Sequence, residues 1–538
     1  MSSPVAPPAV ASQKLDRPGG DIFHSSTART IAVLLTISIG YGLLVSLEPH
    51  RALWFDELIT YYIAKAPTLA GLIDLAHRFD LNPLPMDYVL TRLSITFFGD
   101  SPMAVRLPSV VAFYIASVMV FLYVRRKAGD GFATFSVIML WYSPVFRYAT
   151  EARPYAFLGM FFASLLLFWD IATTAERRAV ALWGVAASNA GLMLVHAFAP
   201  LSLLPFLVAE VWRYRSRRKP DYALWAALLL PALLVVLYLP AARVYSPVIF
   251  PTKFQASPRK IPIFFLHVFG EMGSGMFAAL LAAILAPAAI GRAQGSIVAK
   301  KSAALQMTDV AMIVILVLNP VLLILVLMPR HGPFWDRYCL ATTIGIYIAV
   351  AICVAHRLRF DKLAGYCAAA VLASVLTTEQ VILPKLHRGD TQTAGVLTQV
   401  DPELPIVAAS GLTFLEMDHN EDTNLVSRIY YLRDRSAAVQ YAHATLFEDL
   451  TPFDLLKRYF PIRANVDQYS SFTRRYRQFL VLGTYDYPED WLLRKLAADG
   501  AKLVPIGYYD IPYKDHTIYR VTLPGTTLGE RTGADRGK

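Results

Sequence analysis

The feature that most constrains this chain is a series of apolar runs, each long enough to cross a membrane, that recur up to about Leu383. Only 17% of its 538 residues are charged, whereas a soluble globular protein carries about 25%. Because lipid offers no hydrogen-bond partners to an open backbone, such runs cross the membrane as helices. The sequence therefore predicts a polytopic α-helical membrane protein.

We predict about eleven spans, each of roughly 20 residues once its interfacial turns are added. A further apolar segment, Ile261–Gly270, is expected to enter the membrane only halfway before the eighth span. The predicted spans are Ile31–Leu47, Pro108–Val124, Phe132–Phe146, Tyr155–Ala172, Val180–Val195, Pro200–Trp212, Leu224–Leu239, Phe277–Ile290, Val310–Leu327, Cys339–Ala355 and Leu363–Leu383.

The orientation follows from the basic loops, because cytoplasmic loops are enriched in Lys and Arg. Arg125–Lys127, Arg213–Lys219 and Arg357–Lys362 fall on one side of the predicted membrane. The formal net charge of +11 is thus explained by membrane topology, and we expect no nucleic-acid partner. With an odd number of spans, the N-terminus is cytoplasmic and the C-terminal region extracytoplasmic. We expect a multi-pass protein of the inner (plasma) membrane.

The chain divides into segments of different composition. Residues 1–28 and 526–538 are expected to be disordered tails, and 29–384 to be the transmembrane domain. The first extracytoplasmic loop, 48–107, is expected to hold two surface helices separated by Asn82-Pro83-Leu84-Pro85. Residues 385–525 are polar and predict a small α/β domain. Its expected strands are Pro405–Ser410, Phe479–Gly483, Ala501–Gly507 and His516–Leu523, and its expected helices Thr451–Phe460 and Pro488–Ala498.

Two adjacent carboxylates, Asp56 and Glu57, follow the first predicted span. A carboxylate at a membrane surface is suited to act as a general base in transfer to a hydroxyl. The alternative is an exposed acidic pair in a loop. Charge beside Trp54 and Phe55 at an interface is costly to keep without a use, which favours the functional interpretation. Asp87 is a second, weaker acidic candidate.

Several basic residues fall on the predicted external side, where the positive-inside rule disfavours them. Arg153 follows Glu151 at the start of the fourth span, and arginine suits bidentate phosphate contact. An anionic lipid phosphate is the simplest partner for such cations, although snorkelling towards lipid headgroups explains many single arginines. The other external cations in this group are Lys253, Arg259, Arg330 and Arg337, the last followed by Tyr338.

His196 ends the fifth predicted span in an apolar setting. Such a histidine is more often structural than catalytic. If it is functional, it could contact a phosphate, a sugar, or a metal held with a loop carboxylate.

Five motifs in this order resemble the GT-C membrane glycosyltransferases, in the branch of the protein O-mannosyltransferases (family 39) and the bacterial aminoarabinose-type lipid A transferases. Their order and predicted membrane placement carry the resemblance, which covers the first four spans best. The motifs are Trp54-Phe55-Asp56-Glu57, Asn82-Pro83-Leu84-Pro85, Arg106-Leu107-Pro108-Ser109, Glu151-Ala152-Arg153-Pro154-Tyr155-Ala156 and Arg337-Tyr338.

The resemblance implies a GT-C fold and a sugar donor carried on a polyprenyl phosphate. It implies that Asp56 is the base for an attack with inversion and that Glu57 orients the acceptor or holds Asp56. It also implies that Arg153 and Arg337, flanked by Tyr155 and Tyr338, stabilise the departing lipid phosphate. His196, Asp87, Lys253, Arg259 and Arg330 remain candidates for the substrate cavity.

The resemblance leaves several alternatives open. No D-x-D motif argues for a divalent metal, so metal dependence is undecided and no cofactor is assigned. The acceptor could be lipid A, a protein, another polyprenyl lipid or a glycan. The competing interpretations are a transporter or lipid-linked sugar flippase and a membrane scaffold. Transporters often have ionisable groups near mid-membrane in two related halves, whereas here the polar motifs are expected at one face.

Overall fold

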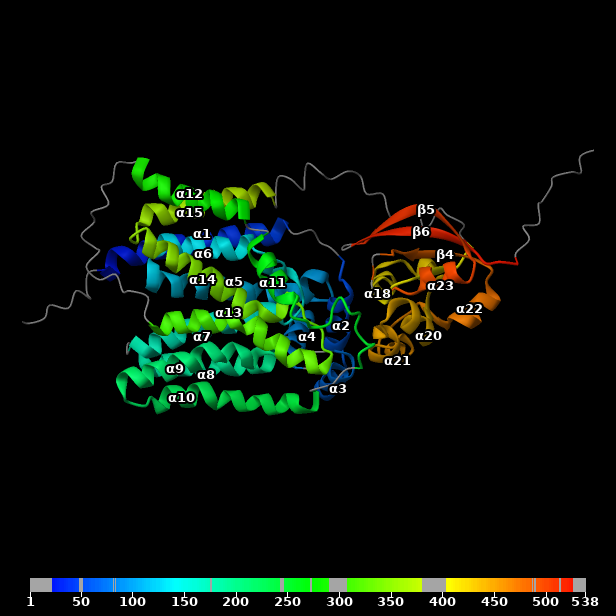
Figure 1. Ribbon diagram of the computed structural model, residues 1–538, viewed down its shortest axis with the longest axis horizontal. Coiled ribbons are helices and arrows are strands. Elements are labelled where there is room, and N and C mark those ends of the chain that lie inside the picture. Colours follow the sequence, from blue (N-terminus) through cyan, green and yellow to red (C-terminus); the bar gives the residue numbers. More distant parts are fainter. Residues whose placement is uncertain are drawn as a thin grey trace, which may run out of the picture.

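The computed structural model describes residues 22–47, 52–80, 82, 84–174, 177–241, 246–270, 273–289, 307–379, 403–485, 487, 490–511 and 514–525. The molecule is elongated, with a helix bundle along its long axis and an α/β domain beyond one end (Figure 1). Most of both predicted tails lies outside the described residues. The part of the N-terminal tail that is described belongs to a helix, because α1 begins at Ile22.

Each predicted span overlaps a helix of the bundle. Within the described residues, six helices are long and apolar enough to cross a membrane, or up to seven if α11 (Lys260–Gly270) and α12 form one span bent by 53°. This confirms a multi-span helical architecture, while the count of eleven stays a prediction. The other bundle helices are α1 (Ile22–Leu47), α5 (Pro102–Ala128), α6 (Asp130–Tyr142), α7 (Tyr155–Thr174), α8 (Arg178–Val195), α9 (Leu204–Arg217), α10 (Tyr222–Leu229), α12 (Gly273–Ala289), α13 (Met307–Leu327), α14 (Leu340–Arg357) and α15 (Lys362–Thr377).

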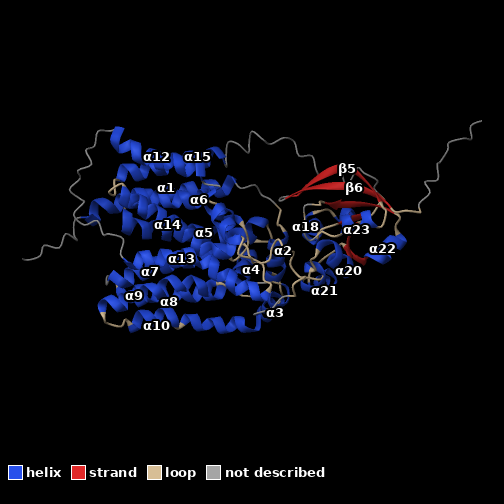
Figure 2. Cartoon of the chain, viewed as in Figure 1, coloured by secondary structure: helices blue, strands red, loops and turns tan. Residues whose placement is uncertain are grey.

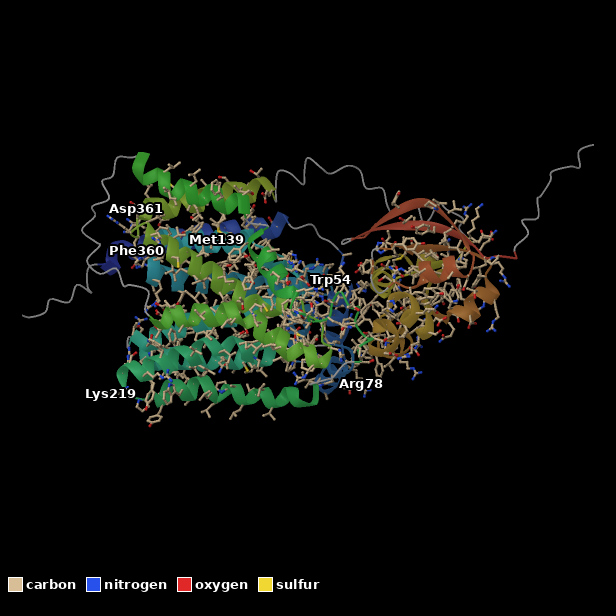
Figure 3. The ribbon with its side chains drawn as sticks, in the orientation of Figure 1. Trp54, Arg78, Met139, Lys219, Phe360 and Asp361 are labelled. Carbon is tan, nitrogen blue, oxygen red and sulfur yellow. The ribbon has the colours of Figure 1, made fainter. Side chains whose placement is uncertain are left out.

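Small residues allow close packing within the bundle. A Cβ atom on Gly131 of α6 would lie 2.7 Å from the backbone oxygen of Lys362, and one on Gly365 of α15 would lie 2.7 Å from the backbone of Gly131. The two helices therefore approach backbone to backbone, as small residues permit in membrane helix pairs. This contact lies at the end of the bundle where Phe360 and Asp361 are found, opposite to Trp54 and Arg78 (Figure 3).

Three short helices of the first loop lie between the bundle and the α/β domain (Figure 1). The two helices predicted in this loop are present as α3 (Leu69–Phe79) and α4 (Met86–Phe98). A third helix, α2 (Phe55–Ala64), was not predicted, and it carries Asp56 and Glu57 in its first turn. Since acidic side chains stabilise a helix N-terminus, this pair also favours the start of α2.

The C-terminal domain contains one six-stranded sheet in the order β3-β2-β1-β4-β6-β5, and Figure 2 shows that strands are confined to this end of the molecule. Strands β1 to β4 run parallel to one another, whereas β6 runs antiparallel to both β4 and β5. The four predicted strands are present, but β2 and β3 were missed. The strands are β1 (Ile406–Ala408), β2 (Ile429–Arg433), β3 (Asn465–Gln468), β4 (Gln478–Gly483), β5 (Lys502–Ile511) and β6 (Lys514–Thr522).

The first loop and the C-terminal domain share one hydrophobic core. Leu58 and Leu72 of the loop belong to the same buried cluster as Phe414 and Leu480 of the domain. Phe460 also packs on loop residues, with its ring 5.2 Å from that of Phe79. Burial of this apolar surface of both the loop and the domain stabilises the contact between them. The domain is therefore packed against the helix that carries Asp56.

Candidate functional site

The two adjacent carboxylates have different environments. The Glu57 side chain is fully buried and accepts hydrogen bonds from Arg106 Nε at 2.7 Å and Nη2 at 2.6 Å. It also accepts one from the Ala152 backbone N–H at 2.9 Å. Glu57 thus joins α2, α5 and the loop before α7, and it is absent from the lining of the cavity described below.

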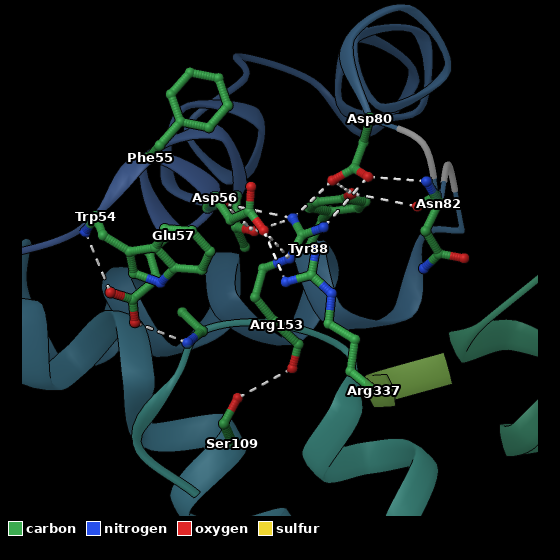
Figure 4. A network of polar contacts seen from close by, with 12 residues as sticks. Trp54, Phe55, Asp56, Glu57, Asp80, Asn82, Tyr88, Ser109, Arg153 and Arg337 are labelled. Carbon is green, nitrogen blue, oxygen red and sulfur yellow. Dashed lines mark hydrogen bonds and ion pairs between the residues drawn. The ribbon is translucent and has the colours of Figure 1, made fainter. Parts of the chain in front are cut away.

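Asp56 points towards two arginines (Figure 4). Its Oδ2 lies 3.4 Å from Nη1 of Arg337 and 3.9 Å from Nε of Arg153. The Asp56 side chain is 21% exposed and lines the cavity. A solvent-accessible carboxylate is therefore held between two cations in a position that a substrate can reach.

Arg153 is neutralised by Asp80, the residue that follows α3 and begins the loop between α3 and α4. Its Nη1 donates to Asp80 Oδ2 at 2.8 Å and to Thr60 Oγ1 at 3.3 Å. Although burial raises the pKa of Asp80, the charge and hydrogen bonds of Arg153 and the Tyr88 hydroxyl hold it below its ordinary value. Both partners are buried, so this pair fixes the loop beside Asp56.

Arg337 is less neutralised than Arg153. Its guanidinium lies 4.8 Å from the ring of Trp335 and 5.2 Å from the ring of Tyr155, which hold it by cation–π contacts. Its Nε is buried and has no hydrogen-bond partner in the described part of the chain. Among the described residues, Asp56 is the one carboxylate within ion-pair distance of Arg337. The positive charge of Arg337 is therefore offset by one carboxylate, whereas Arg153 lies close to both Asp80 and Asp56.

His196 lies in an aromatic wall of the cavity. Its ring centroid is 5.3 Å from that of Tyr338 and 5.8 Å from that of Tyr155. Burial, together with the charges of Arg153 and Arg337, lowers the pKa of His196 to about 3. The imidazole is therefore neutral at physiological pH and contributes packing and hydrogen bonding rather than charge.

Asn82 explains why the Asn-Pro motif lies near His196. Its Nδ2 donates to the Val195 oxygen at 2.7 Å, and its Oδ1 accepts from the Ala197 N–H at 2.9 Å. The Asn82 amide thus binds the backbone on both sides of His196 and connects the first loop to the end of α8.

The cavity has a volume of about 460 Å³ and lies where the bundle, the first loop and the C-terminal domain meet. Asp56, Arg337 and the aromatic wall line it from the bundle and the loop. The domain contributes residues that follow the carboxyl ends of β1, β2 and β4, which is where open parallel sheets bind ligands. These residues are Leu412, Leu446, Leu450, Thr451 and Tyr487.

The predicted site residues divide into two groups. Asp56, Arg153, Tyr155, His196, Lys253, Arg337 and Tyr338 all line the cavity. Glu57, Asp87, Arg259 and Arg330 do not line it, and a role for them in substrate binding or catalysis stays a prediction. Arg259 and Arg330 are exposed to solvent, and Asp87 is buried in α4 with both carboxylate oxygens unpartnered in the described structure. Burial raises the pKa of Asp87 to about 8, so its carboxyl is protonated near neutrality.

A second cavity of about 270 Å³ lies on the other side of Arg337, between α11, α14 and the 3₁₀ helix η1 (Pro144–Thr150). Apolar residues such as Phe264 and Leu340 line it together with Arg147. The His267 ring lies 2.6 Å from Asp336 at its rim. Arg337 is thus shared by an interdomain cavity and a cavity between bundle helices.

Sequence reasoning missed two carboxylates that shape the site. Asp80 precedes the Asn-Pro motif by two residues, and this proximity was the available signal. Glu416 lies in the C-terminal domain on α18 (Gly411–Asn420), and its Oε1 accepts the Phe55 N–H at 3.1 Å. No sequence pattern connects Glu416 to residues 361 positions away.

The described residues contain no group of three or more His, Cys, Asp or Glu side chains that could hold a metal ion. His196, the histidine in the aromatic wall, is influenced by the charges of Arg153, Arg337 and Asp80.

Comparisons with known proteins agree with this architecture. Residues 82–239 match the family model of dolichyl-phosphate-mannose-protein mannosyltransferases. The fold is similar to that of ArnT from Cupriavidus metallidurans in the apo state, with a TM-score of 0.50, 14% identity, and coverage of 92% of this chain and 98% of that chain. The same protein bound to undecaprenyl phosphate gives a TM-score of 0.49, with 14% identity and the same coverage. No curated protein matches. The family-model match and the fold of apo ArnT confirm the resemblance to the GT-C membrane glycosyltransferases.

Proposed function

We propose that this protein is a membrane glycosyltransferase that transfers a sugar from a polyprenyl phosphate to an acceptor hydroxyl. The observation that carries this proposal is the accessible carboxylate of Asp56, 3.4 Å from the guanidinium of Arg337 at the lining of a cavity. A base and a phosphate-binding cation at this distance suit displacement at an anomeric carbon. The family model that matches residues 82–239 supports a lipid-phosphate sugar donor.

In the proposed reaction, Asp56 takes the proton of the acceptor hydroxyl. The acceptor oxygen attacks the anomeric carbon from the face opposite the phosphate, and the bond from that carbon to the phosphate oxygen breaks. The sugar is transferred with inversion, and polyprenyl phosphate leaves with one more negative charge. Arg337 stabilises that charge, because it lies beside Asp56 and lines both cavities.

The two cavities suggest where the substrates bind. The cavity between α11 and α14 has a mixed lining, in which apolar side chains such as Phe264 and Leu340 lie beside Arg147 and Arg337. This combination suits a phosphate attached to an isoprenoid chain. The interdomain cavity contains Asp56 and Lys253 and suits the acceptor. Lys253 is exposed and forms no ion pair in the described part of the chain, so it can contact a phosphate or an anionic acceptor from this side.

The structure supports changes to two of the expected roles. Arg153 is already paired with Asp80 at 2.8 Å, so we assign it to hold the loop and Asp56 rather than to bind the phosphate alone. Glu57 is paired with Arg106 outside the cavity, so we assign it to hold α2 in place. We further propose that the reaction takes place on the extracytoplasmic face, as the basic loops at the other end of the bundle predict.

The test is release of polyprenyl phosphate from labelled polyprenyl-phosphate sugars by the purified protein, with membrane extract as the acceptor source. Release of labelled lipid together with a labelled product would support the proposal, and that product would identify the acceptor. If several donor sugars gave no release, while labelled lipid crossed the bilayer of a proteoliposome, the flippase interpretation would replace it.

A further inference from the structure

The first turn of α2 is completed by a residue from the other domain. The first N–H groups of a helix have no partner within the helix. In α2, the Phe55 N–H donates to Glu416 Oε1 at 3.1 Å, and this bond is buried. The preceding N–H, that of Trp54, lies 3.4 Å from Glu57 Oε2. The C-terminal domain thus caps the helix that carries Asp56.

This contact is part of a built interface. Glu416 lies on α18, which packs against α2 on the side of the domain that faces the bundle (Figure 1). Two turns further along α2, the Tyr62 hydroxyl lies 3.0 Å from Nδ1 of His419, also on α18. The Phe55 ring lies 5.8 Å from that of Phe447. Because these contacts follow α2 along its length, they fix both its position and its rotation.

We infer that Glu416 of the C-terminal domain is a positioning residue that holds the start of α2 and thereby keeps Asp56 directed at Arg337. This inference rests on the proposed function for the role of Asp56. Phe55 immediately precedes Asp56, so a shift of its backbone moves the carboxylate, and a displacement of about 1 Å in a reacting group can cost on the order of 10²-fold in rate. The burial that raises the pKa of Glu416 to about 7 also shields its hydrogen bond from water.

Three variants test this inference. Glu416→Ala removes the acceptor of the Phe55 N–H, whereas Glu416→Gln keeps an acceptor oxygen of the same reach. Tyr62→Phe removes a different hydrogen bond between α2 and α18 and leaves the Phe55 contact in place, so it is the matched control. Amide hydrogen exchange by mass spectrometry over residues 52–64 reports the helix start directly, and donor turnover reports Asp56.

For Glu416→Ala we expect faster exchange at the start of α2 and a turnover lower by on the order of 10²-fold, with an unchanged KM for the donor. For Glu416→Gln we expect the exchange rate and the turnover to recover to within about threefold of wild type, because the glutamine side-chain oxygen can still accept the Phe55 N–H. Tyr62→Phe should leave turnover near wild type.

Unchanged exchange in Glu416→Ala would overturn the inference. So would an equal loss of turnover in Tyr62→Phe, because general loosening of the interface would then explain both variants. If the wild-type protein transfers no sugar, the proposed function fails, and the exchange data alone decide whether Glu416 holds α2.

Discussion

The carboxylate of Asp56 and the guanidinium of Arg337 lie 3.4 Å apart, although 281 positions separate them in the sequence. Asp56 is on the first turn of α2, and Arg337 is on the 3₁₀ helix η6 (Asp336–Cys339) that leads into α14. The pair faces the interdomain cavity, while Arg337 also lines the second cavity. This arrangement places the proposed base in the interdomain cavity and the proposed phosphate-binding cation at the border of both cavities.

Asp56→Asn should abolish transfer and leave donor binding intact. An amide cannot take the acceptor proton, and a positioned base contributes about 10²- to 10⁴-fold to the rate. Release of labelled polyprenyl phosphate measures the rate, and binding of the labelled donor by the purified variant measures affinity. Asp100→Asn is the control, because Asp100 is an exposed partner of Lys65 and its loss should change neither quantity. Wild-type turnover in Asp56→Asn would exclude Asp56 as the base.

Arg337→Ala should weaken donor binding and also slow transfer. It removes the cation that both cavities share, and loss of one donor to a transition-state anion costs about 10²- to 10³-fold. Arg337→Lys should recover part of this loss, because lysine keeps the charge but not the planar fork of donors. Steady-state kinetics with varied donor separate the effects on KM and kcat. Arg330→Ala is the matched control, because Arg330 is exposed. Similar losses of donor binding and transfer in Arg330→Ala and Arg337→Ala would contradict the assignment of Arg337.

Arg153→Ala should act mainly on stability. It leaves Asp80 buried without its cation, and breaking a buried ion pair in this way costs about 3 to 5 kcal/mol. Asp80→Asn should destabilise the protein for the same reason, and the double variant should lose less than the sum of the two single losses. Thermal unfolding in detergent measures these effects. A stable Arg153→Ala protein with a strongly raised donor KM would instead return Arg153 to phosphate binding.

The stability of Asp87→Asn relative to the wild-type protein should increase as the pH rises. The pKa of Asp87 is raised to about 8 by burial, so between about pH 4 and pH 8 the folded protein keeps a proton that the unfolded chain has lost. Wild-type stability therefore falls with rising pH through this window, by at most about 1.4 kcal/mol per pH unit from this group. Asparagine cannot ionise and avoids this loss. Melting temperatures of both proteins from pH 4 to pH 8 test the divergence, and parallel curves would contradict it.

Motif order in the sequence predicted much of the site but not its pairings. Asp56, Arg153 and Arg337 were identified because charge in an apolar chain is conspicuous, and all three line the cavity. The pairing of Arg153 with Asp80 was missed. Arg153 and Arg337 give the same signal in the sequence, and only interatomic distances show which of the two has Asp80 as its partner. Arg259 and Arg330 have the same composition signal as Lys253 but lie outside the cavity, because a loop sequence does not determine which side chains face inward.

Apolar runs and their periodicity in the sequence were enough to predict the membrane-spanning helical class, the positions of the bundle helices and the small α/β domain. Runs of apolar residues and their periodicity are local properties, and the bilayer or a core acts on them segment by segment. The tertiary structure alone decided that Glu57 is an internal ion-pair partner while its neighbour Asp56 faces the cavity. It also decided that Glu416 completes the helix that holds Asp56. These relationships depend on contacts between distant segments, whose geometry is set by packing in three dimensions rather than by any local pattern.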